Sequence, residues 1–91
     1  MKDFKVFIPD PVIFETLDGE ALLLHTETGV YFSLNETGVR IWELILEHCR
    51  LGLVKDLLIE EYQVSRDVVE RDISALLKDL EVHGLIEVKP V

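Results

Sequence analysis

Cysteine is almost missing from this chain, since Cys49 is the only one among 91 residues and no internal disulfide can form. Metal-ligand patterns are missing too: the three histidines, His25, His48 and His83, have no cysteine or carboxylate at metal-ligand spacing. We interpret each histidine as structural or solvated. His48 and Cys49 point about 100° apart on a helix, which does not suit a nucleophile and its base. Cys49 continues an apolar stripe and is interpreted as a small core residue. We therefore expect no catalytic residue, no metal and no cofactor.

Long hydrophobic runs are also lacking. The longest are about four residues, such as 21–24, whereas a membrane-spanning helix needs roughly 20. The N-terminal residues 1–5 lack the apolar region of a signal peptide. We expect a cytoplasmic domain with no membrane partner.

Basic residues are scarce. Nine lysines and arginines face 18 acidic residues, which gives a formal net charge of -9. Nucleic acid and anionic lipid both require a basic surface, so neither is an expected partner, whereas a cationic partner is permitted. Neighbouring carboxylates such as Glu60 and Glu61 are interpreted as a solvated helix face, because nothing in the sequence encloses them.

What is present is enough apolar sequence for one core. Hydrophobic residues form 48% of the chain, and its length fits a single domain spanning residues 1–91. No internal repeat, linker or low-complexity segment interrupts it.

The first third predicts β-structure. Two β-like runs, 12–17 and 20–26, flank Asp18-Gly19, the sequence typical of a type I′ hairpin turn. A second turn at 27–29 leads into a third strand, 30–34. Pro9 and Pro11 place the start of the chain in an arm or at a sheet edge.

The remainder predicts three helices. Asn35 is the expected N-cap of a helix over 36–49 that Gly52 ends, followed by a shorter helix over 53–61. Ser65 caps a third helix that finishes near His83-Gly84. Residues 85–88 could form a short terminal strand. The predicted fold class is α+β and winged-helix-like, with a three-stranded antiparallel β-sheet packed on three α-helices.

In a winged-helix DNA-binding protein, the third helix would be the recognition helix that lies in the major groove. It carries three basic residues against five acidic ones, so phosphate would repel it. A winged-helix DNA-binding transcription regulator therefore stays as the alternative function rather than the leading one.

A flank of the same helix mixes small or apolar residues with aspartates. Val68, Asp72, Ala75 and Asp79 lie beside the core stripe, which suits a shallow groove for an extended peptide. An equally good interpretation of the pattern is that Val68 and Ala75 only widen the core stripe.

Three segments carry a family resemblance. Residues 34–44 (LNETGVRIWEL) resemble the "LN-x-T/S-…-I-W/L-x-L" segment of the coenzyme PQQ synthesis protein D family. Residues 72–86 (DISALLKDLEVHGLI) resemble its ending, "D-V-x-x-F/L-L-x-x-L-x-x-x-G-L-I", and 57–62 resembles its "I-x-x-x-L-x-x-x-Y" stretch less closely. The resemblance covers roughly residues 20 to 88, and it lies in the order and spacing of these motifs, because each alone is mostly core leucines.

The resemblance implies a RiPP recognition element, a non-enzymatic domain that binds the leader of a ribosomally made precursor peptide. The leader would add as a strand beside the third strand and lie against the third helix. The implied peptide-binding residues are Val30, Tyr31, Phe32, Ser33, Leu34, Val68, Asp72, Ala75, Leu76 and Asp79. Val30, Phe32 and Leu34 would form the groove floor, and the aspartates would meet basic leader residues.

One departure bears on the pathway. Residues 48–52 lack the family's usual "D-G-x-x-T" turn. This favours a lasso or another peptide pathway over quinone-cofactor synthesis, with an enzyme such as a leader peptidase or cyclase as the second partner.

Overall fold

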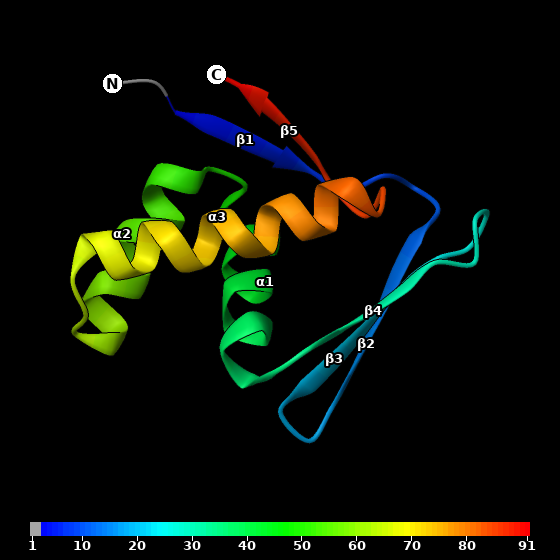
Figure 1. Cartoon of the computed structure of the whole chain (residues 1–91), viewed down its shortest axis with the longest axis horizontal. Helices are drawn as coiled ribbons and strands as arrows, with labels where there is room; N and C mark the ends of the chain where they lie inside the picture. The colour runs from blue at the N-terminus through cyan, green and yellow to red at the C-terminus, as the bar shows by residue number, and fades with distance from the viewer. Residues whose placement is uncertain (1–2) are drawn as a thin grey trace.

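The structure, a computed structural model, describes residues 3–91. Met1 and Lys2, which belong to the predicted domain and to the segment inspected for a signal peptide, lie outside the described residues. The elements in chain order are β1 (Phe4–Phe7), β2 (Val12–Leu17), β3 (Glu20–His25), β4 (Tyr31–Leu34), α1 (Glu36–His48), α2 (Leu51–Tyr62), α3 (Arg66–Val82) and β5 (Glu87–Pro90) (Figure 1). The predicted α+β class, with a three-stranded antiparallel sheet and three helices, is confirmed.

The three-stranded sheet has the order β2-β3-β4. The predicted turn between its first two strands is confirmed, because Asp18 and Gly19 both have positive φ, 50° and 79°. One face packs on the helices: Ala21 and Leu23 are buried at alternate positions of β3, and Val12 of β2 and Leu34 of β4 are buried on the same face. β4 continues directly into α1, with Asn35 as the N-cap that accepts from the Gly38 N–H.

The helix boundaries differ from prediction at one junction. α1 ends at His48, and Cys49 is its C-cap, with a left-handed φ of 63° and an N–H that donates to the Ile45 carbonyl. Its position in this turn leaves Cys49 exposed, so its prediction as a core residue is wrong. Gly52 does not end a helix either: it lies in the first turn of α2, which begins two residues earlier than predicted.

The two ends of the chain form a sheet of their own. β1 pairs antiparallel with β5, from Phe4 opposite Pro90 to Phe7 opposite Glu87, so the first and last strands lie side by side (Figure 1). β1 was not predicted as a strand. The predicted terminal strand begins later than expected, because Leu85 and Ile86 are buried core residues that precede β5.

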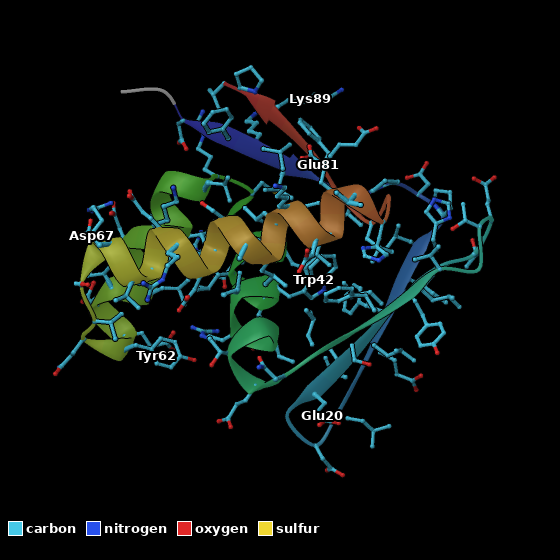
Figure 2. All side chains as sticks on the ribbon, in the orientation of Figure 1. Glu20, Trp42, Tyr62, Asp67, Glu81 and Lys89 are labelled. Carbon is cyan, nitrogen blue, oxygen red and sulfur yellow. The ribbon has the colours of Figure 1, made fainter. Side chains whose placement is uncertain are left out.

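The core lies where α3 crosses α1, between the terminal sheet and the β2-β3-β4 sheet (Figure 1). Trp42 of α1, only 1% exposed, lies at its centre (Figure 2). The ring of Phe14 on β2 packs edge-on against the Trp42 ring, with the centroids 5.8 Å apart. Within residues 3–91, every helix is too short or too polar to span a membrane.

Candidate functional site

The outer edge of β4 is open along the chain's described residues. β4 pairs with β3 on one side only, with Leu23 opposite Phe32 and Leu22 opposite Ser33. The His25 N–H donates to the Val30 carbonyl at 2.8 Å, and hydrogen-bonded pairs alternate along an antiparallel ladder. Phe32 therefore directs its backbone groups toward β3. Tyr31 and Ser33 direct theirs outward, where another strand could pair with them.

A groove runs along this open edge. We call it the strand groove; its volume is about 510 Å³, and its walls come from β4, the first turns of α1 and the middle of α3. Its lining residues are Phe32, Ser33, Leu34, Asn35, Thr37, Gly38, Ile41, Asp72 and Leu76. The groove therefore places an unpaired strand edge next to a helix, which is the geometry that an added strand requires.

A second hollow continues the strand groove between the helices. This helix pocket, about 220 Å³, shares Thr37, Ile41 and Asp72 with the strand groove. Its remaining lining is largely apolar: Leu58, Tyr62, Val64, Val68, Val69 and Ile73. An extended chain leaving the strand groove could therefore place an apolar side chain here.

Asp72 stands at the junction of the two hollows and is exposed. Its one ion pair among the described residues is a long one, 3.9 Å from the Arg71 Nε. Arg66 of α3 and Arg40 of α1 are engaged elsewhere: Arg66 pairs with Asp56 at 2.7 Å, and Arg40 pairs with Glu61. The hydrogen bond to Glu61 raises the pKa of Arg40. The junction is therefore acidic and suits a basic side chain.

Phe32, which lines the strand groove, packs against an aromatic side chain at the end of α3. The Phe32 ring lies edge-on to the His83 ring with centroids 5.6 Å apart. The His83 Nδ1 lies 2.6 Å from the Asp79 carbonyl oxygen, which fixes the imidazole at the end of α3. Phe32 is thereby held half-buried on the inner face of β4, where it forms the groove floor.

The structure brings together six of the ten predicted peptide-binding residues. Phe32, Ser33, Leu34, Asp72 and Leu76 line the strand groove, and Val68 lines the helix pocket. The other four, Val30, Tyr31, Ala75 and Asp79, line neither hollow. Tyr31 is still part of the open edge through its backbone, although its side chain is 69% exposed on the opposite face of the sheet. A role in peptide binding stays a prediction for all ten residues.

Sequence reasoning missed the contribution of α1 and α2. Thr37, Gly38 and Ile41 border the strand groove because β4 runs into α1 without a loop. That signal was available in the sequence, since Asn35 caps the helix immediately after the strand. A β-carbon at Gly38 would lie 3.2 Å from the Leu34 Cδ2, so glycine permits the close approach of helix and strand. No local sequence pattern predicts that Tyr62 and Val64 line the helix pocket.

Among the residues that line the strand groove, Asp72 is the one with a titratable side chain. No three histidine, cysteine, aspartate or glutamate side chains within residues 3–91 are grouped so that they could hold a metal ion. What the site offers is hydrogen-bonding backbone, an apolar floor and one carboxylate.

Comparison with known proteins agrees with this geometry. The family model for coenzyme PQQ synthesis protein D (PqqD) matches residues 20–86. The solved structure of TbiB1 in complex with the TbiA(beta) leader peptide is 41% identical and has a TM-score of 0.83, covering 89% of this chain and 94% of that one. No curated protein matches the sequence. The resemblance drawn from residues 34–44, 57–62 and 72–86 is thereby confirmed.

Proposed function

The chain belongs to the coenzyme PQQ synthesis protein D (PqqD) family, and from this premise we propose that it binds the leader segment of a ribosomally made precursor peptide. The observation that carries the proposal is the open edge of β4 beside the strand groove. The similarity to TbiB1, whose solved structure holds the TbiA(beta) leader peptide, supports it.

The binding mode is β-strand addition. The leader pairs with the outward backbone groups of Tyr31 and Ser33, and its alternate side chains enter the strand groove over Phe32 and against Leu76. The backbone pairing supplies affinity for any extended chain, whereas the shape of the groove selects among leaders. Asp72 favours a leader with a basic residue at the junction, and the helix pocket favours an apolar residue beyond it.

Binding also delivers the precursor. The second partner is a modifying enzyme such as a leader peptidase or cyclase, as in a lasso pathway, and the domain works in the cytoplasm. A domain that holds the leader and docks on the enzyme raises the effective concentration of the core peptide at the active site. We assign no chemical step to the chain itself.

DNA binding has no observation in its favour. α3 carries Arg66, Arg71 and Lys78 against five carboxylates, and Arg66 is paired with Asp56. A helix with net negative charge would be repelled electrostatically by the phosphates of DNA.

The test is titration of fluorescently labelled leaders from the neighbouring precursor gene against the wild type and the Phe32→Asp variant. Phe14→Asp is the matched control, because Phe14 and Phe32 face the same way in one cross-strand row, with Leu23 between them, but on opposite edges of the sheet. We expect saturable binding that Phe32→Asp loses and Phe14→Asp keeps, with folding of each variant checked by circular dichroism. A folded wild type that binds none of the leaders would contradict the proposal.

A further inference from the structure

The face of the β2-β3-β4 sheet that points away from the core is unusually apolar. The ladder has eight outward positions, which are residues 13, 15, 17, 20, 22, 24, 31 and 33. A half-buried antiparallel sheet normally turns polar side chains to water on this side. Here five of the eight are apolar, and we call Ile13, Leu17, Leu22, Leu24 and Tyr31 the outer sheet face.

Four of these five residues are exposed, Leu24 is half-buried, and they form a contiguous surface. Ile13, Leu17, Leu22 and Tyr31 are 54%, 65%, 44% and 69% exposed. The register places Ile13, Leu24 and Tyr31 in one row across all three strands, and Leu22 occupies the middle of the next row. Contiguous exposed apolar side chains of this kind mark interaction surfaces in soluble domains.

The outer sheet face is separate from the leader site. Its side chains alternate with Phe32 and Leu34, which point to the groove, so a partner on this face would leave the groove accessible. A leader strand added to β4 would be the next strand of the same sheet. Every second side chain of the leader would then extend the outer sheet face beyond Tyr31.

The acidic residues around the outer sheet face indicate which kind of partner can bind there. No lysine or arginine occurs between Lys5 and Arg40, whereas Glu15 and Glu20 lie on the face itself and Asp18 and Glu27 lie in its turns. Glu20 stands at the free end of the β2–β3 hairpin, away from the helices (Figure 2). Two copies of this chain would bring these carboxylates together, which disfavours a homodimer. A partner with an apolar patch flanked by lysine and arginine would complement them.

We propose that the outer sheet face is the docking surface for the modifying enzyme, which presents an apolar patch with a basic rim. The identity of the enzyme rests on the proposed function, whereas the surface itself does not. Because the bound leader extends the same face, the enzyme contacts both the domain and the leader. The enzyme therefore binds the loaded domain more tightly than the empty one.

The test uses the purified enzyme encoded beside the gene of this chain and measures its affinity by isothermal titration, with and without saturating leader. The variant is the double substitution Ile13→Ser and Leu22→Ser, on strands that do not touch the leader. The control is Val82→Ser, an apolar residue that is 76% exposed and belongs to α3 rather than to the outer sheet face. We expect the double variant to weaken enzyme binding at least about tenfold, while Val82→Ser and the affinity of every variant for leader stay within about twofold of wild type.

The charge rim provides a second readout. Glu15→Lys with Glu20→Lys should slow enzyme association and remove most of its dependence on ionic strength. Enzyme binding that the apolar double variant leaves unchanged, or no enzyme binding at all, would overturn the proposal. So would a wild-type dimer, seen by sedimentation, that the double variant abolishes, because the face would then serve self-association. Enzyme binding through this face without any leader binding would instead remove the proposed function and leave the docking surface standing.

Discussion

Replacing Ser33 by proline isolates strand addition from every other contribution to leader binding. Proline removes one backbone N–H and puts a ring in its place. The Ser33 N–H points outward from β4 and makes no bond to β3, so the ladder loses nothing. The residue before it, Phe32, is already extended, which is the conformation that a following proline favours.

The magnitude follows from the one bond that is lost. A leader carbonyl that loses its donor in the strand groove is left unsatisfied, which costs about 1–3 kcal/mol. That range corresponds to a dissociation constant raised roughly 5- to 150-fold. Fluorescence anisotropy with the labelled leader measures it, and thermal unfolding of the free domain should show little change.

Thr16→Pro is the matched control. Thr16 lies on β2, the other edge of the same sheet. The Thr26 N–H donates to the Pro11 carbonyl, so the backbone groups of Pro11 point toward β3, and those of Thr16, an odd number of residues later, point outward. Leader affinity should be unchanged in this variant. A folded Ser33→Pro protein that binds leader like the wild type would refute strand addition at β4, and a selective loss in Thr16→Pro would move the leader to β2.

Three further predictions concern charge, core and pH. Asp72→Lys should weaken a leader with a basic residue at the junction more than Asp79→Lys does, because Asp72 lines both hollows and Asp79 lines neither; the paired titrations check this, and equal losses would contradict it. Leu80→Ala, at a fully buried position, should lower the free energy of unfolding by about 2–5 kcal/mol in urea denaturation. A change below about 1 kcal/mol would contradict this and show that neighbouring side chains move in to fill the cavity. Asp3 accepts hydrogen bonds from the Gly52 and Phe4 N–H groups, and these lower the pKa of its carboxyl. The stability that Asp3 contributes is thus present above the ordinary aspartate pKa and is lost as pH falls through its lowered value, so the stability difference between wild type and Asp3→Ala should shrink below about pH 4; a constant difference across that range would exclude a role for the ionised form.

The site shows which parts of the reasoning from sequence were sufficient. Alternation along 30–34 placed Phe32 and Leu34 on the inner face, and the helical periodicity of the third helix placed Val68 and Asp72 on its flank; these four residues line the strand groove or the helix pocket. Both patterns depend only on the period of a single element. Ala75 and Asp79 were assigned to the same flank, but neither of them lines the groove. The angle between a strand and a helix is not encoded in the period of either one.

The sequence alone determined the elements whose signals are local. Asp18-Gly19 specified its turn, and Asn35 and Ser65 specified two helix starts, because each acts through backbone groups within about three residues. Only the tertiary structure decided the rest. β1 forms because β5 returns beside it, and α2 begins at Leu51 where Asp3, from the other end of the sequence, accepts from the Gly52 N–H. The helix pocket likewise exists only because α1, α2 and α3 converge at Asp72 and Ile41. Such contacts join residues tens of positions apart, and they stabilise the protein only once the chain has folded. No local sequence pattern therefore predicts them.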